Sequence, residues 1–332
     1  MKGICTRQTV AAVCSAALIL TAGSAGIVRA ADTPAPAGFP SKPVRLLVPN
    51  APGSPLDLLS RTLSGKLSEP WKQPVLIDNR PAAVGVVAAE VVSRAPADGH
   101  SLFMVSLTQL LVFLVHQKHQ LHTEFAPVSA LGTTPFAIVV NASVPAKSIA
   151  EYVALAKSRP GQLTYASSGT WGSTHVCMEF LNELAGINVL HVPHTTAPAA
   201  INAVIAEQVH SFCPAAPSVA AIAQSGKLRA LGVTYRQPTK LMPGIPPVSD
   251  TLPGFELLGW YGVQATAGTP AASIARLNAD FQVALRQTDV QERLLALGVD
   301  AKGSTPAEYL GFLNRETERW GKILKDRNAR PE

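Results

Sequence analysis

The segment VRLLVPNAPGSPLDLL, residues 44–59, changes within a few positions from an apolar run to a loop of small residues and then to a helical pattern. Residues 44–48 predict a buried strand, because branched apolar side chains follow one another with little interruption. Proline and glycine interrupt the run at residues 49–55. Leucine then recurs at the three- to four-residue spacing of a helix, at Leu56, Leu59, Leu63 and Leu67. The segment therefore predicts a strand, a loop and a helix in that order.

The same alternation of apolar runs and helical patterns continues along the chain. Short runs at residues 75–77, 101–105 and 137–140 predict strands, and residues 102–115 as a whole indicate a buried strand and loop. The alternation resumes after Pro160 and Gly161, and the last third is mostly helical in pattern. Repeated units of this kind predict the α/β class, with mainly parallel sheets that carry helices on both faces.

Composition excludes several classes of protein. Of the 332 residues, 47% are hydrophobic and 15% charged, which argues against a disordered chain. Aromatic residues amount to 6%, so the chain offers few aromatic side chains on which nucleobases could stack. Lys2, Arg7 and Arg29 account for half of the net charge of +6, and the remaining positive residues are scattered. We expect no nucleic-acid partner.

The first 30 residues have the pattern of a secretory signal. Lys2 and Arg7 precede an apolar stretch at residues 10–20, and Val28-Arg29-Ala30 offers a cleavage site. The apolar stretch is about half the roughly 20 residues that a membrane-spanning helix needs, so an anchor is the less favoured alternative. We predict that residues 1–30 are a cleaved signal peptide and that the protein is located in the periplasm of a Gram-negative bacterium.

Only two cysteines, Cys177 and Cys213, follow the predicted signal peptide. An exported protein can form a disulfide between them. Buried free thiols fit the sequence equally well, because nothing in it shows that the two side chains meet. The sequence leaves both alternatives open.

Two loops of small residues each follow a predicted strand and open a predicted helix. The first covers residues 49–57 and the second, YASSGTWGSTH, covers residues 165–175. The start of a helix exposes unpaired N–H groups and a partial positive charge, and small residues let an anion come close to them. The pair of loops suggests two halves of one anion site, and two ordinary helix caps are the simpler alternative.

Motifs spread from Phe39 to Lys325 resemble one known family. They are FPSKPVR at residues 39–45 with Pro52-Gly53 and Asp57, NRP at 79–81, PADG at 96–99, FAPV at 125–128, VPAKS at 144–148, YASSG at 165–169 with His175, GKLRAL at 226–231, WYG at 260–262 and AGTP at 267–270. In this order they resemble the Bug receptors, which are extracytoplasmic solute-binding receptors of the tripartite tricarboxylate transporter type.

The resemblance implies a two-domain periplasmic binding protein of the type II-like class, with a hinge between the domains. The chain would cross between domains near Val140 and Gly259. Residues 31–140 and 259–332 would form the first domain and residues 141–258 the second. Closure of the two domains would enclose the ligand. We expect a monomer.

The resemblance also implies that both loops hold a ligand carboxylate through backbone N–H groups, small hydroxyls and water. The first loop would contribute Asn50, Ala51, Gly53, Ser54 and Asp57, and the second Ser167, Ser168, Gly169, Thr170 and His175. Asp57 would cap its helix or orient water, because direct contact with an anion would be repulsive.

The chain departs from the family pattern at several positions near these loops. Trp171 stands where the family usually has glycine, and would narrow the ligand space or give it an aromatic wall. His194 stands in a segment where the family often has Tyr-Lys-Gly, and we include it as a residue that makes binding sensitive to pH. His210 and Pro214 replace residues that are usually acidic. These departures bear on the identity of the ligand.

The predicted function is therefore a periplasmic receptor that captures a small carboxylate, either a di- or tricarboxylate, an amino acid or an aromatic acid. Its partner would be the membrane subunits of a tripartite tricarboxylate transporter. An alternative is a sensor of the same fold whose partner is a sensor kinase. A remote alternative is a serine hydrolase that uses Ser167 or Ser168 with His175 and Asp57.

Other features argue against an enzyme. The serines do not lie in a G-x-S-x-G turn, and the sequence has no G-x-G-x-x-G, P-loop, H-E-x-x-H or C-x-x-C motif, so we expect no catalytic residues and no cofactor. His116, His119 and His122 resemble a metal cluster, but one helix would not bring all three together. We expect a solvated loop there and no metal site.

Overall fold

The computed structural model describes residues 38–236, 241–326 and 329, and all of them lie in one compact unit. The predicted signal peptide, residues 1–30, lies outside the described residues. Among the described residues, no helix combines the length and the apolar character that crossing a bilayer requires.

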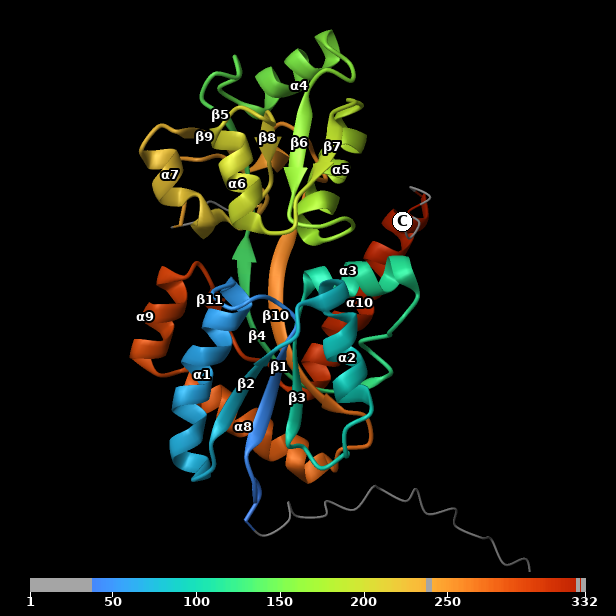
Figure 1. Cartoon of the computed structure of the whole chain (residues 1–332), viewed down its shortest axis with the longest axis vertical. Coiled ribbons are helices and arrows are strands. Elements are labelled where there is room, and N and C mark those ends of the chain that lie inside the picture. Colours follow the sequence, from blue (N-terminus) through green and yellow to red (C-terminus); the bar gives the residue numbers. More distant parts are fainter. Residues whose placement is uncertain (1–37, 237–240, 327–328, 330–332) are drawn as a thin grey trace, which may run out of the picture. The chain divides into compact units, whose positions relative to one another are not determined.

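The described strands form two sheets (Figure 1). The first sheet has the order β11-β4-β10-β3-β1-β2. Its strands are β1 (Val44–Val48), β2 (Val75–Asn79), β3 (Ser101–Ser106), β4 (Phe125–Pro135), β10 (Leu258–Thr266) and β11 (Asp300–Ala301). The strand and helix predicted from residues 44–59 are confirmed as β1 and α1 (Pro55–Trp71), with Ser54 as the N-cap of the helix.

Helices cover both faces of the first sheet, because successive side chains of a strand point to opposite faces. Leu46 packs in a cluster with α1, α8 (Ala271–Leu285) and α9 (Thr288–Ala296). Leu47 packs on the opposite face with α2 (Val86–Ser93), α3 (Leu107–His116) and α10 (Pro306–Asp326). A short 3-10 helix, η1 (Ala82–Gly85), precedes α2.

The second sheet has the order β7-β6-β8-β5-β9 and is also covered on both faces. Its strands are β5 (Ala137–Asn141), β6 (Thr164–Ser167), β7 (Leu190–Pro193), β8 (Ser211–Phe212) and β9 (Leu228–Val233). The accompanying helices are α4 (Ile149–Ser158), α5 (Ser173–Ala185), α6 (Ala197–Ile205), η2 (Ala216–Ser218), α7 (Ala220–Gln224) and η3 (Val248–Asp250).

The predicted α/β class is confirmed, but the expectation of mainly parallel sheets is wrong, because both sheets are mixed. β1 runs parallel to β2 and β3, and β6 runs parallel to β7 and β8. β10 is antiparallel to both β3 and β4, and β5 is antiparallel to β8 and β9. The chain leaves the first sheet along β4 and returns along β10, so these neighbours run in opposite directions.

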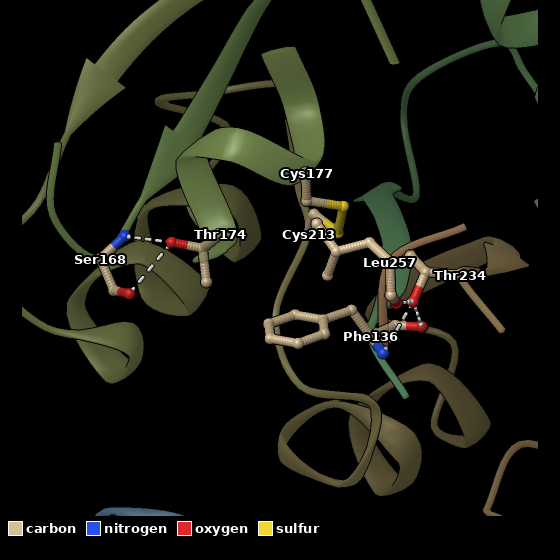
Figure 2. Close-up of a disulfide and its surroundings, with 7 residues drawn as sticks. All are labelled: Phe136, Ser168, Thr174, Cys177, Cys213, Thr234 and Leu257. Carbon is tan, nitrogen blue, oxygen red and sulfur yellow. Dashed lines mark hydrogen bonds between the residues drawn. A yellow bond between two sulfur atoms is a disulfide. The ribbon is translucent and has the colours of Figure 1, made fainter. Parts of the chain in front are cut away.

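The two connections between the sheets are bonded to each other (Figure 2). Phe136 N–H donates to Thr234 Oγ1 at 3.0 Å, and Thr234 Oγ1 donates to the Leu257 carbonyl at 2.6 Å. A Cβ at Gly259 would lie 2.7 Å from the Phe136 ring, so only glycine fits there. Phe136 and Thr234 therefore mark where the chain changes sheet.

The predicted crossings near Val140 and Gly259 lie inside strands. Val140 belongs to β5 of the second sheet, and Gly259 belongs to β10 of the first. The strands change sheet between Pro135 and Ala137, and again between Val233 and Leu258. The division into domains at residues 31–140, 141–258 and 259–332 stays a prediction.

Helix α3 replaces the loop that was expected after β3. Ser106 and Gln109 form a capping box, in which each side chain bonds the other's backbone N–H. The resulting helix, Leu107–His116, is almost entirely buried because most of its side chains are apolar. The expectation of a strand and loop across residues 102–115 is therefore wrong in its second half, and the Ser-x-x-Gln pattern is the signal that would have found the helix.

The two cysteines that the sequence left unassigned form a disulfide (Figure 2). Cys177 lies in α5, and Cys213 follows β8 directly. Both residues are fully buried. The bond joins the helix that begins at the second predicted loop to the segment that follows a central strand.

Replacing both cysteines by alanine should lower the stability of the protein without changing its fold. The cysteines are 36 residues apart, so the loss of the cross-link should cost about 3–4 kcal/mol of unfolding free energy. Chemical denaturation of the mature chain measures the unfolding free energy. The value for wild-type protein denatured in the presence of a reductant should equal the value for the variant. Equal stability of variant and oxidised wild type would contradict the assignment.

Candidate functional site

The predicted loops lie at the ends of parallel strands, where ligands of α/β proteins usually bind. In the first sheet, β1, β2 and β3 are parallel neighbours, so the segments that begin at Pro49, Arg80 and Leu107 share one edge. A Cβ at Gly85 would lie 2.6 Å from Pro49 Cβ, and Gln109 Nε2 donates to the Val84 carbonyl at 3.3 Å. The three segments are therefore in mutual contact.

The second sheet has an equivalent edge. β6, β7 and β8 are parallel neighbours, and their ends open into the segments that start at Ser168, His194 and Cys213. The predicted second loop is the first of these segments. His194 N–H donates to the Ser167 carbonyl at 3.0 Å, so the structure brings two of these segments together.

Two contacts join the edges of the two sheets. Thr108 Oγ1 and Ser173 Oγ, at the starts of α3 and α5, lie 2.9 Å apart within one hydrogen bond. The turn after α9 approaches η2 so closely that a Cβ at Gly298 would overlap the ring of Pro217. Since each contact pairs an element of one sheet with an element of the other, the two edges face each other.

A buried carboxylate shapes the first loop. Asp57 is 1% exposed, and its Oδ2 accepts from the Gly53 N–H at 2.8 Å and from Arg61 Nε at 2.9 Å. Its Oδ1 accepts from Asn79 Nδ2 at 3.0 Å, and the same Nδ2 donates to the Asn50 carbonyl at 3.0 Å. Asp57 therefore holds the loop from inside the protein and ties it to the end of β2.

The environment of Asp57 favours its ionised form. Burial alone would raise the pKa of the carboxyl, but hydrogen bonds from Arg61, Gly53 and Asn79 outweigh it and hold the pKa below its ordinary value. The carboxylate is thus charged at neutral pH. Its charge is balanced by Arg61, half of whose side chain is exposed to solvent.

Hydroxyl groups shape the second loop. Thr174 Oγ1 accepts from the Ser168 N–H at 3.0 Å and bonds Ser168 Oγ at 3.1 Å (Figure 2). Ser167 Oγ accepts from the Gly169 N–H at 3.3 Å. Gly169 has a φ of +143°, a conformation that L side chains rarely adopt. The loop is therefore bonded to its own residues and to the first turn of α5.

Histidines pack beneath the second loop. His175 is buried, and its Nδ1 accepts from the Trp171 N–H at 3.0 Å. The rings of His175 and His191 have centroids 4.0 Å apart, and Tyr165 stacks on His191 at 5.1 Å. His191 Nε2 lies 2.7 Å from Ser167 Oγ. The stack supports the loop from the side of the sheet.

Trp171 adopts a left-handed backbone, with φ of +59°, where glycine is the usual residue. Its half-buried indole packs edge-on against His175, with ring centroids 4.9 Å apart. Thr170 beside it is also half-buried. Both residues lie in the second loop as predicted, and their contact with a ligand stays a prediction.

Several predicted donors are engaged within the protein. The N–H groups of Gly53, Ser168 and Gly169 bond Asp57, Thr174 and Ser167 respectively. Ser54 N–H donates to the Ala51 carbonyl at 3.2 Å, and Ser54 Oγ caps α1. These residues shape the loops in this structure. At the two edges, the described N–H groups for which the structure has no protein acceptor include those of Asn50, Ala51, Leu107, Thr108, Ser173 and Thr174.

His194 lies at the edge of the second sheet, beside the second loop. Its Nδ1 donates to the Val192 carbonyl at 3.1 Å, and its side chain is half-buried. The structure therefore brings the His194 backbone close to Ser167. The effect of His194 on binding stays a prediction.

The Ser-His-Asp arrangement of the hydrolase alternative is not assembled. Ser167 Oγ pairs with His191 instead of His175, and it is fully buried. Asp57 is bonded to Gly53, Arg61 and Asn79, with no histidine among its partners.

The described residues contain no group of three side chains suited to a metal ion. Of the three histidines weighed as ligands, His116 ends α3, and His119 Nδ1 lies 2.8 Å from Glu124 Oε2. His119 is half-buried, so the expectation of a solvated loop does not extend to its side chain.

Sequence reasoning missed Thr108, Ser173, Asn79 and His191 as residues of this region. Asn79 stands in the NRP motif at residues 79–81, and the Ser-x-x-Gln capping pattern at residues 106–109 points to the helix start that carries Thr108. Ser173 lies within the predicted second loop, but its partner Thr108 is 65 residues away, and His191 carries no local signal because its partner Ser167 is 24 residues away.

Comparison with known proteins gives a consistent result. The sequence model of the tripartite tricarboxylate transporter family receptor matches residues 59–329. A relative from a Pseudomonas species, "UPF0065 protein in tcbD-tcbE intergenic region", is 34% identical over 86% of this chain and 86% of its own. Protein BugT of Bordetella pertussis is 28% identical over 94% of this chain and 95% of its own.

Solved structures agree with these relatives. A protein of R. palustris with adipate has a TM-score of 0.82 and 26% identity, over 89% of this chain and 100% of its own. MatC from Rhodopseudomonas palustris with bound malate has a TM-score of 0.78 and 26% identity, over 86% of this chain and 100% of its own. The shared fold is that of periplasmic binding proteins.

Replacing Asp57 by asparagine should destabilise the first loop. The amide would present a donor where the carboxylate accepts, and we expect a loss of about 2–3 kcal/mol at pH 7. Because the pKa of Asp57 is lowered in the folded protein, its stabilisation holds above the ordinary pKa and is lost as the pH falls through the lowered value. The difference in unfolding free energy between the wild type and the variant should therefore decrease below about pH 4.

Denaturation curves between pH 2 and pH 8 measure this difference. Asp78→Asn is the control, since Asp78 pairs with Arg45 and Arg80 near the surface and should cost at most about 1 kcal/mol. A loss for Asp57→Asn that is equally large at pH 2 and pH 7 would contradict the role of its charge.

Proposed function

Because the chain belongs to the family of tripartite tricarboxylate transporter receptors, the Bug receptors, we propose that it binds a small carboxylate in the periplasm. The ligand would bind between the facing edges of the two sheets. The predicted signal peptide at residues 1–30 supports export. The adipate and malate bound by two structural neighbours support a carboxylate as the ligand.

The observation that carries this proposal is the contact between the starts of α3 and α5. Thr108 and Ser173 are the hydroxyl residues that meet there, and the first two N–H groups of each helix have no protein acceptor among the described residues. Helix starts that lie side by side concentrate backbone donors and partial positive charge in one place. A carboxylate is the kind of group that such donors stabilise.

The binding mechanism is one of noncovalent capture. A charge-assisted hydrogen bond contributes about 1.5–3 kcal/mol. A few such bonds therefore account for the binding free energy of about 8 kcal/mol that corresponds to a micromolar Kd. Asp57 and Thr174 would keep the loops in shape before the ligand arrives, which lowers the entropy cost of binding. No bond is made or broken in this cycle.

The family relationship also supports a partner in the membrane. We propose that the loaded receptor delivers its ligand to the membrane subunits of a tripartite tricarboxylate transporter. Motion of the two sheets relative to each other would release the ligand, and the two connections joined at Phe136 and Thr234 would act as the hinge.

A binding screen of the purified mature chain tests the carboxylate proposal. Mono-, di- and tricarboxylates, amino acids and aromatic acids are added in turn, and thermal unfolding and product formation are followed together. Stabilisation by a carboxylate without turnover supports a receptor, because a ligand that binds the native state raises the unfolding temperature. Product formation would favour an enzyme. If no compound of the panel raised the unfolding temperature, the proposal would be refuted.

Gly169→Ala should weaken carboxylate binding more than it affects stability. The new Cβ meets no atom within 4 Å, so the effect comes from the backbone, whose φ of +143° is strained for alanine. A strain of about 1–2 kcal/mol would reshape the second loop and weaken binding about 5- to 30-fold.

Gly186→Ala is a matched control at the opposite end of α5. Gly186 has a φ of +60° and equally open space, so alanine should strain the backbone there as well. Calorimetric titration should show unchanged affinity in the control. Equal affinity of the Gly169→Ala variant and the wild type would show that the second loop takes no part in binding.

A further inference from the structure

We propose that Gly298 and Pro217 are positioning residues, whose contact sets how closely the facing edges of the two sheets approach each other. This inference rests on the proposed function, because the ligand would bind between these edges, and it assigns to that function two residues outside both loops. A side chain at position 298 would hold the edges apart. Neither residue needs to touch the ligand for this effect.

Gly298 lies in a turn that is fixed to the first sheet. It follows Leu297, the C-cap of α9, and has a φ of +76°. Its N–H donates to the Leu295 carbonyl at 2.8 Å. The Val299 N–H donates to the Leu294 carbonyl at 2.8 Å, and the two bonds form a Schellman motif. Val299 is fully buried, and β11 begins at the next residue and pairs with β4. The turn therefore moves with the first sheet.

Pro217 lies in η2, which is fixed to the second sheet. Ala216 and Val219 are fully buried in a core cluster that contains side chains of β5, β6, β8 and β9. Ala215, the residue before η2, forms an antiparallel bridge with Phe136. The ring of Pro217 therefore moves with the second sheet.

The proline ring lies directly against the glycine. A Cβ at Gly298 would lie 2.0 Å from Pro217 Cγ, 2.4 Å from its Cβ and 2.8 Å from its Cδ. The ring is rigid, so none of its atoms can rotate away. Carbon atoms in contact are about 3.5–4.0 Å apart, so a side chain at position 298 would require a separation of about 1.5–2 Å at this point.

This contact and the contact between Thr108 and Ser173 lie on opposite sides of the strands that cross between the sheets. The crossing strands β4 and β10 are neighbours in the first sheet. β11, which follows the Gly298 turn, pairs with β4, and β3, which precedes Thr108, pairs with β10. A side chain at position 298 would therefore tilt the sheets about the crossing strands and change the distance between the starts of α3 and α5.

Gly298 also has a simpler role, which is to end α9 in a left-handed conformation that favours glycine. If that were its whole role, alanine would have the same effect whether or not the ring of Pro217 is present. The positioning role predicts that the effect on binding disappears when the ring is removed. The two roles are therefore distinguished by combining the substitutions.

Four forms of the full mature chain provide the test: wild type, Gly298→Ala, Pro217→Gly and the variant with both substitutions. Adipate and malate are titrated calorimetrically into each form at pH 7. Gly298→Ala should weaken the binding of an acid that binds the wild type by about 10- to 100-fold, since overpacking a contact has an effect of this size. The double variant should regain most of the affinity, because glycine at position 217 lacks all three ring atoms that the new Cβ would meet.

Gly226→Ala is the matched control for backbone strain. Gly226 follows the C-cap of α7, has a φ of +78° and has no atom within 4 Å of the position of a Cβ. Alanine there introduces a similar strain without a contact between the sheets, so the affinity should not change. Wild-type affinity in Gly298→Ala would overturn the inference. A double variant that binds as weakly as Gly298→Ala would also overturn it, because the loss would then come from strain in the turn.

A distance measurement separates this inference from the proposed function. Spin labels are attached to Glu69→Cys in α1 and Lys157→Cys in α4, both exposed positions. The native cysteines form a disulfide, so the labels react with the introduced thiols. Without ligand, Gly298→Ala should shift the mean distance between the labels by about 1.5 Å or more, and the double variant should restore it.

This measurement decides the inference even if neither acid binds the wild type. Absence of binding would count against the proposed function and leave the distance between the sheets to be compared among the variants. An unchanged distance in Gly298→Ala would overturn the inference. A shift that Pro217→Gly reverses would support it.

Discussion

Backbone N–H groups at helix starts need acceptors, and this requirement governs the region where the two sheets meet. The protein meets it at most positions with its own side chains, through Asp57 in the first loop and Thr174 in the second. It leaves the first N–H groups of α3 and α5 without a protein acceptor among the described residues. The loops are thus bonded within the protein, and in the proposed function the helix starts beside them supply the donors for an anion.

The architecture behind this region depends on a few contacts between distant segments. Phe136, Thr234 and Leu257 bond the two connections between the sheets, so the crossing strands keep a common register. The Cys177–Cys213 disulfide fastens α5 to the end of β8. Since α5 begins at the second loop, the disulfide and the histidine stack set the position of that loop from within the second sheet.

In the proposed function, the facing edges of the two sheets hold a small carboxylate. Two structural neighbours hold acids with two carboxylates, adipate in one and malate in the other. In this chain the acidic groups near the edges are bonded to arginines, amides and a tyrosine hydroxyl.

The sequence alone determined the α/β class, the strand and helix at residues 44–71, both small-residue loops and the family, because these depend on local periodicity and on ordered motifs. Tertiary structure alone decided the mixed sheets, the disulfide and the use of each donor. Whether the Gly53 N–H faces a ligand or Asp57, and whether Ser167 pairs with His175 or His191, depends on side chains brought together by folding. The local sequence does not determine the distances between groups that folding brings together, so these assignments required the three-dimensional structure.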